Sequence, residues 1–215
     1  GLANYLLKSS SNEKEIRVVV GFDSRHHSKE FADVTAKVLA ANGIKAYVFK
    51  NLRPTPFISF SCRHLKCLSA VMITASHNPG EYNGYKVYWS DGGQVLPPHD
   101  KGIIDEYKKI TSPDDVKRVE SLENPNITIL DDEIDSIYLE KVKDLQLLKE
   151  NNQKDGKELK ILYSNLHGTG ITTFPPALKL WGFSDLSFVE KQKPLDGDFT
   201  FAHPPNPEVK STLQM

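Results

Sequence analysis

The pattern of hydrophobic and polar positions changes between two periods along most of the chain. Short β-branched and aromatic runs, bounded by Gly, Pro or Asn, predict strands at 16–22, 44–49, 68–74, 84–89, 159–163 and 186–189. Apolar residues at helical spacing predict helices at 1–8, 28–42, 56–65, 99–110, 131–148 and 171–181. Strands that alternate with helices indicate an α/β fold, with a mixed, mostly parallel sheet flanked by helices. The 84–89 strand is expected to run antiparallel, because no crossover helix precedes it.

The helix over 28–42 has the clearest predicted boundaries. Ser28 can cap its first turn, and the pair Asn42-Gly43 is typical of a helix end. The face that it turns to the sheet is expected to consist of Phe31, Val34, Val38 and Leu39.

A polar, acidic stretch divides the chain. Residues 111–133 carry Pro113 and Pro125 and are predicted to be a linker or domain edge. We therefore expect a first domain over 1–130 and the start of a second α/β domain over 131–215, with the same order of strand, loop, helix and strand. The chain has no initiator Met and no closing element at its other end. It is expected to be an N-terminal fragment whose second domain is truncated.

Composition and charge exclude several classes of protein. Of the 215 residues, 39% are hydrophobic and 26% charged, which is enough to bury a core and excludes a mainly disordered chain. The net charge of −1 gives no basic excess for nucleic acid or an anionic membrane. No apolar run approaches the roughly 18 residues that a membrane span needs. Cys62 and Cys67 lack a second pair of zinc ligands and are expected to be reduced thiols, which favours a cytoplasmic protein.

Ser76 is the leading candidate for chemistry. It follows the strand at 68–74 and lies in a loop with Asn and Pro, and ligands of open α/β sheets bind beyond the carboxyl ends of strands. A turn serine that satisfies its own backbone is the alternative. A hydrolase nucleophile is disfavoured, because no Gly-x-Ser-x-Gly elbow is present and the adjacent His77 is too constrained to be its base. A serine that carries a phosphoryl group fits better, since Lys86 and Arg25 could supply positive charge.

Other polar groups have two interpretations each. Lys86 either serves the site or faces solvent from its strand, and Arg25 with Asp23 forms either an orienting ion pair or a simple loop salt bridge. The segment HGTG at 167–170 is similar to a phosphate loop but lacks the glycines and Lys of the known fingerprints, so a structural role is favoured. The acidic segment at 196–198 is interpreted as a turn.

The segment TASHNP at 74–79 closely resembles the active-site loop of the α-D-phosphohexomutases, the phosphoglucomutase and phosphomannomutase superfamily. Further segments are similar to family signatures: Val20–Arg25, Pro54–Pro56, Asn83–Tyr88, His167–Gly170 and Pro205–Glu208. The strand at 85–89 and the segment at 98–102 look most like the branch that handles phosphoglucose or phosphopentose.

The resemblance implies a role for each matching residue. Ser76 would be a phosphoserine that donates its phosphoryl group to the substrate and regains one from a sugar bisphosphate intermediate. Its phosphate would also ligate Mg²⁺. His77 would line the loop, Lys86 would be a candidate general acid/base, and Arg25 would position the loop. The implied partner is a small-molecule sugar phosphate, with a sugar 1,6-bisphosphate as activator and Mg²⁺ as cofactor.

The implied activity is interconversion of sugar 1-phosphate and sugar 6-phosphate. A phosphopentomutase, a sugar-bisphosphate synthase of the same superfamily and a non-catalytic sugar-phosphate binding module are the alternatives. The sequence also departs from the family. The leading Gly-Thr-rich arginine motif, the triple-aspartate metal loop expected after Pro205–Glu208, and the sugar-recognition and C-terminal phosphate loops are missing. The chain alone is therefore expected to be inactive.

Overall fold

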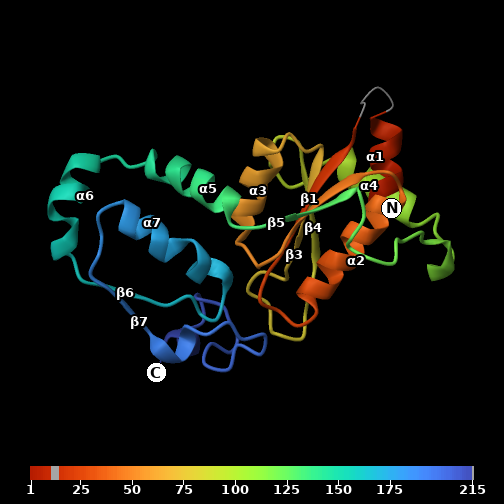
Figure 1. Ribbon diagram of the computed structural model, residues 1–215. Helices are drawn as coiled ribbons and strands as arrows, with labels where there is room; N and C mark the ends of the chain where they lie inside the picture. The colour runs from red at the N-terminus through yellow and green to blue at the C-terminus, as the bar shows by residue number, and fades with distance from the viewer. Residues whose placement is uncertain (11–14, 215) are drawn as a thin grey trace.

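The computed structural model describes residues 1–10 and 15–214. A five-stranded sheet in the order β4-β3-β1-β2-β5 forms its centre (Figure 1). The strands are β1 (Arg17–Phe22), β2 (Lys45–Phe49), β3 (Ser69–Ile73), β4 (Tyr85–Trp89) and β5 (Ile127–Leu130). Neighbouring strands pair in parallel except β4, which runs antiparallel to β3. The predicted α/β class, the mostly parallel sheet and the direction of the 84–89 strand are confirmed.

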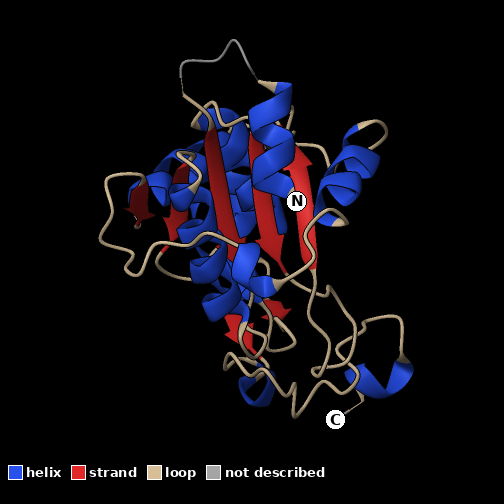
Figure 2. Cartoon of the chain, turned by 90° about the vertical axis from the view of Figure 1, so that its right-hand side faces the viewer, coloured by secondary structure: helices blue, strands red, loops and turns tan. Residues whose placement is uncertain are grey.

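Helices cover both faces of this sheet (Figures 1 and 2). One face carries α1 (Leu2–Ser9), α2 (Ser28–Ala41) and α4 (His99–Tyr107), and the other carries α3 (Thr55–His64). The central strand β1 is therefore buried on both sides, and Val18, Val19 and Val20 are fully buried. This burial explains why the strand is a continuous apolar run rather than an alternating one.

Helix α2 begins at Ser28 as predicted, but the predicted cap is wrong and the predicted buried face is wrong in part. Ser28 makes no cap, because its hydroxyl donates to the carboxylate of Asp23 instead. Phe31 and Val34 are 48% and 45% exposed. The face against the sheet consists mainly of small residues, which bring the helix backbone close to the strands: Ala32, Thr35, Ala36, Leu39 and Ala40.

The predicted linker contains one of the two edge strands of the five-stranded sheet. β5 lies within 111–133 and pairs with β2. Only Ile127 and Leu130 of this strand are buried. A four-residue strand with two inward-facing residues leaves too short a pattern to be recognised within a polar stretch.

The chain after β5 forms a second, smaller α/β unit. Helix α5 (Glu133–Lys143) leads to α6 (Lys149–Asp155), and the strands β6 (Ile161–Tyr163) and β7 (Leu186–Phe188) pair in parallel around α7 (Phe174–Leu180). Helix α6 is not among the helices predicted from the sequence. It has no buried residue, and so no apolar periodicity marks it in the sequence.

Short 3-10 turns complete the described chain: η1 (Pro113–Asp115), η2 (Gly156–Glu158), η3 (Thr169–Thr172), η4 (Glu190–Gln192) and η5 (Lys210–Leu213). Across the described residues, every helix is too short or too polar to cross a bilayer.

Candidate active site

The site lies where β1 and β3 end side by side. The backbone N–H of Asp23, just after β1, donates to the carbonyl of Ile73 at the end of β3, with N and O 3.1 Å apart. The N–H of Thr74 donates to the carbonyl of Gly84, just before β4, at 3.0 Å. The sheet thus brings the loops that follow β1 and β3 to one edge, as expected for ligand sites of parallel sheets.

Ser76 has a backbone conformation that residues other than glycine rarely adopt. Its φ is 59°, in the left-handed region, where a residue other than Gly is held by its surroundings. Its N–H donates to Oγ1 of Thr74 at 2.9 Å, and the N–H of Asn78 donates to the carbonyl of Ala75 at 3.1 Å. The Oγ of Ser76 lies 3.4 Å from Nδ1 of His77, too far for a firm hydrogen bond. The loop is therefore fixed through its backbone while the hydroxyl stays available.

Arg25 binds the backbone of this loop through its guanidinium group. Its Nη2 donates to the carbonyls of Ser76 and Asn78 at 2.8 and 2.6 Å, and its Nη1 donates to those of Pro79 and Tyr82 at 2.8 and 2.9 Å. All four N–H groups on the terminal nitrogens are thus used by loop carbonyls. Arg25 is placed to fix the backbone around Ser76, and it has no terminal N–H left for a ligand.

The guanidinium of Arg25 is taken out of water. Its side chain is fully buried, and the carboxylate of Asp23 lies 3.3 Å from its Nε. Burial lowers the pKa of Arg25, while the charge of Asp23 opposes that shift. Asp23 also accepts hydrogen bonds from the Arg25 N–H at 3.0 Å and the Ser28 hydroxyl at 2.8 Å. The Arg25–Asp23 pair is therefore sheltered and bonded to the Ser76 loop, and its orienting role stays a prediction.

Asn83 ties the far end of the loop to the same network. Its Nδ2 donates to the Ser28 hydroxyl at 2.8 Å, and its Oδ1 accepts the N–H of Gly84 at 2.8 Å. Both ends of the Ser76 loop are consequently anchored to the segment that follows β1.

A cavity of about 320 Å³ opens in front of Ser76. It is lined by both parts of the chain: Asp23, Ser24, Thr55, Met72, Thr74, Ser76 and His77 from the first, and Gly168, Thr169, Phe199 and Pro207 from the second. Its hydroxyl and backbone groups suit a polar ligand. Gly168 and Thr169 belong to the 167–170 segment, for which a structural role was favoured, and they now lie in the same cavity as Ser76.

His167 fixes the position of that segment. Its Nδ1 lies 2.7 Å from the carbonyl of Pro194, and its Nε2 lies 3.1 Å from the backbone N of Phe201. A carbonyl can only accept and an N–H can only donate, so Nδ1 of His167 donates to Pro194 and its Nε2 accepts from Phe201. The hydroxyl of Ser24 donates to the carbonyl of His167 at 3.1 Å, which joins the segment to the loop after β1.

The other predicted site residues lie near the cavity in different ways. His77 lines it and is exposed. Lys86 does not line it, but pairs in register with Met72, which does. Residues opposite one another on antiparallel strands share a face of the sheet, so Lys86 lies on the side of the cavity.

The fit of a metal ion can be tested against the groups that are present. Mg²⁺ takes about six oxygen ligands. Among residues 1–10 and 15–214, no three His, Cys, Asp or Glu side chains gather in a way that could hold a metal ion. Ser76 alone does not make such a site.

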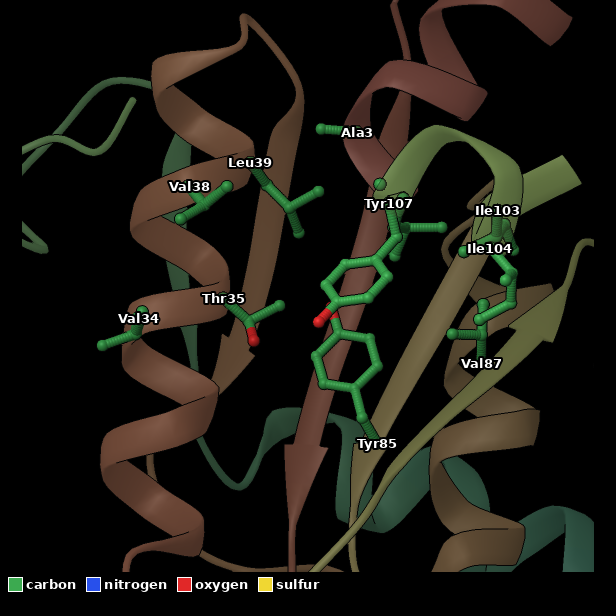
Figure 3. A pocket seen from close by; sticks show the side chains of 12 residues that line it. Ala3, Val34, Thr35, Val38, Leu39, Tyr85, Val87, Ile103, Ile104 and Tyr107 are labelled. Carbon is green, nitrogen blue, oxygen red and sulfur yellow. The ribbon is translucent and has the colours of Figure 1, made fainter. Parts of the chain in front are cut away.

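A larger cavity of about 510 Å³ lies away from Ser76, between α1, α2, α4 and β4 (Figure 3). Its lining is mostly carbon, with the side-chain oxygens of Thr35, Tyr85 and Tyr107 as exceptions. None of the residues predicted to perform chemistry lines it, so the smaller cavity is the candidate site despite its size.

Two groups of this site were missed by sequence reasoning. Phe199 is 4% exposed and is one of the residues that line the cavity. A single aromatic residue after the acidic turn at 196–198 was the available signal. Thr55 begins α3 and lies in the segment Pro54–Pro56, for which no site role was predicted. Nothing in its spacing from Ser76 indicates that the two share a cavity.

The fold and this site define an α/β protein with a conformationally fixed serine at the carboxyl edge of a mostly parallel sheet. Residues 1–114 match the family model described as phosphoglucomutase/phosphomannomutase, alpha/beta/alpha domain I, and residues 136–215 match the model of domain II. The chain belongs to the phosphoglucomutase/phosphomannomutase family.

Individual relatives agree with the family match. The chain is 37% identical to a probable phosphoribomutase of Schizosaccharomyces pombe, over 100% of this chain and 37% of that protein. It is 36% identical to a human glucose 1,6-bisphosphate synthase, over 100% of this chain and 36% of that protein. A crystal structure of a putative phosphomannomutase from Thermus thermophilus superposes with a TM-score of 0.72 at 26% identity, covering 92% of this chain and 41% of that one. The chain thus spans little more than a third of the length of these curated relatives.

Proposed function

We propose that the full-length protein interconverts sugar 1-phosphate and sugar 6-phosphate through a phosphoserine at Ser76 and a sugar bisphosphate intermediate. The observation that carries this proposal is the Ser76 loop itself. The loop that carries a serine in a left-handed conformation is held by four hydrogen bonds from one buried arginine, and this serine lines the cavity. A group that is phosphorylated in each cycle must return to the same position, which this anchoring supports.

The proposed phosphoryl transfer needs no reactant besides the phosphoserine and the sugar phosphate. The bond between phosphorus and Oγ of Ser76 breaks as a bond forms between phosphorus and a hydroxyl oxygen of the substrate. The proton leaving that hydroxyl passes to a general base, and a proton returns to Oγ of Ser76. The resulting bisphosphate then gives its other phosphoryl group back to Ser76, which completes the isomerisation.

Lys86 and His77 are the proposed partners of this step. Lys86 would act as general acid/base from the face of the sheet that it shares with Met72. His77 would line the loop beside the phosphate. Arg25 would act only through the backbone, because its terminal N–H groups are engaged by carbonyls.

The proposed cofactor is Mg²⁺, which neutralises phosphoryl charge in such transfers. Among the groups of this chain, the phosphate on Ser76 is the proposed ligand, and the other ligands would come from outside the described residues. The predicted domain division, 1–130 and 131–215, puts Ser76 and Thr169 on different domains. We propose that the substrate binds between these domains, and that the protein works in the cytoplasm.

The substrate is proposed to be a hexose phosphate, with pentose phosphate as a second candidate. The relative named as a probable phosphoribomutase favours the second candidate. The relative named as a glucose 1,6-bisphosphate synthase supports a third outcome, in which the bisphosphate is the product.

The test uses the full-length protein with Mg²⁺. Intact mass is measured after incubation with glucose 1,6-bisphosphate, and turnover is measured with glucose 1-phosphate and ribose 1-phosphate in parallel. An added mass of about 80 Da that is absent from Ser76→Ala, together with turnover that Ser76→Ala abolishes, supports the proposal. Turnover that survives in Ser76→Ala would contradict it, and an unmodified, inactive wild-type protein favours a binding module.

A further inference from the structure

The ring of Phe199 covers the guanidinium of Arg25. The Cζ atom of Arg25 lies 5.0 Å from the ring centroid, within the range of a cation–π interaction. The two residues lie 174 positions apart in the sequence, and Phe199 belongs to the second α/β unit. The face of a phenyl ring is electron-rich, so this contact favours the charged group that anchors the Ser76 loop and also separates it from water.

Phe199 is held in place against its own backbone preference. Its φ is 53°, a left-handed conformation that is rare for a bulky residue, and the side chain is 4% exposed. The carboxylate of Asp196 accepts the N–H groups of Asp198 and Thr200 at 2.9 and 3.0 Å, one on each side of Phe199. Residues with such strain are concentrated at functional sites, where the surrounding structure compensates for it.

The segment around Phe199 also touches the Ser76 loop through backbone. A Cβ added to Gly80 would lie 2.7 Å from the carbonyl oxygen of Gly197, which leaves no room for a side chain at position 80. His26 and Asp198 form a polar contact of 2.7 Å beside it, but both side chains are more than half exposed. An exposed pair contributes little. Of these two side-chain contacts, the buried one between Phe199 and Arg25 is the one that can affect the loop.

We propose that Phe199 is a positioning residue for the phosphoserine loop, acting through Arg25. With the ring in place, the guanidinium has no competing water, and its four hydrogen bonds to loop carbonyls are strong and directional. Without the ring, water competes for the same N–H groups and the loop is held less firmly. Removal of the second unit from the first would remove Phe199 as well, so the same contact couples the Ser76 loop to the position of that unit.

This inference deepens the proposed function and rests on it for its kinetic part. The full-length protein is compared with Phe199→Ala, Phe199→Leu and Phe199→Tyr. Phe201→Ala is the matched control, because it removes the same ring two positions on, where the side chain is 49% exposed. Two readouts are used: hydrogen exchange of the backbone amides in 76–84, which needs no activity, and the rate at which glucose 1,6-bisphosphate phosphorylates Ser76.

Phe199→Ala is expected to speed exchange in 76–84 by about tenfold or more and to slow phosphorylation by about 10- to 100-fold, with less than a threefold change in KM. Phe199→Tyr is expected to keep the wild-type exchange rate and the wild-type phosphorylation rate, because it keeps an aromatic ring at this position. Phe199→Leu, which keeps apolar cover without the π face, is intermediate and replaces the Ala variant if that variant does not fold. Phe201→Ala behaves as wild type. Unchanged exchange in 76–84 for a folded Phe199→Ala or Phe199→Leu protein overturns the inference. An unphosphorylated wild type overturns the proposed function instead, and the exchange data then still decide the role of Phe199.

Discussion

Arg53 and Asp135 form a two-point ion pair that joins the central sheet to the first helix of the second unit. Nε and Nη2 of Arg53 donate to the two carboxylate oxygens of Asp135 at 2.9 and 2.7 Å. Nη2 also contacts Asp132 at 2.9 Å. The Arg53 side chain is 5% exposed, Asp135 is 26% exposed and Asp132 is 76% exposed. One arginine therefore has a sheltered partner and an exposed one, which allows a controlled comparison.

Asp135→Ala should destabilise the protein much more than Asp132→Ala. Removing the sheltered partner leaves a buried guanidinium poorly paired, and we expect the free energy of unfolding to fall by about 2 kcal/mol. Removing the exposed partner should cost less than about 1 kcal/mol. Urea denaturation of both variants checks this difference. Equal losses of unfolding free energy would show that the two contacts stabilise the protein equally despite their different exposure.

Arg25→Lys should slow phosphorylation of Ser76 although it keeps the charge. An ammonium has three donors at one point and cannot reach the four carbonyls that the planar guanidinium holds. We expect a loss of about 100-fold in the rate with glucose 1,6-bisphosphate. Arg17→Lys is the control, because the Arg17 side chain is 38% exposed and pairs only with Glu15 among the described residues. A loss below about threefold for Arg25→Lys would mean that the loop keeps its shape without this anchor.

The sequence was sufficient to predict the helices and strands that have a buried apolar face. The strand that ends before Ser76 and the strand that ends before Arg25 are continuous apolar runs, so their direction and the edge at which they end could be predicted. Helix α6 and strand β5 were missed for the opposite reason. The first buries nothing, and the second buries only Ile127 and Leu130.

The candidate site could be predicted only within single loops. Ser76 and Lys86 belong to one continuous segment, and Arg25 follows the neighbouring strand. Phe199 reaches the same site from the second unit. Its contact with Arg25 depends on how the two units pack together. A local sequence pattern does not predict that packing. For the same reason, the 167–170 segment was interpreted as structural, because its place beside Ser76 is a tertiary property.

Gly80→Ala should separate the Ser76 loop from the segment that carries Phe199. The new methyl carbon would lie 2.7 Å from the backbone oxygen of Gly197, which cannot rotate away as a side chain could. We expect a loss of about 1–3 kcal/mol in stability and faster hydrogen exchange in 196–200. Gly93→Ala is the matched control, since its nearest neighbour is the Asp91 carboxylate at 3.3 Å, and that side chain can move. If exchange in 196–200 did not change in the Gly80 variant, the two segments would not be in close contact in solution.

The two cysteines should make the stability of the protein fall at high pH. Burial raises the pKa of Cys62 and of Cys67 to about 12, because the thiolate would lose its hydration. In the unfolded chain, both thiols ionise at their ordinary value of 9.0. A raised pKa in the fold means that the contribution of each thiol is fully present below about pH 9 and is lost as the pH rises from 9 towards 12. At pH 10 the expected loss is about 1.4 kcal/mol for each thiol. Other groups titrate in the same range, so urea denaturation at pH 8 and pH 10 is compared with the same measurements on a variant carrying Cys62→Ala and Cys67→Ala. That variant should lose about 3 kcal/mol less than the wild type over this interval, and equal losses would mean that the thiols are not buried in the native state.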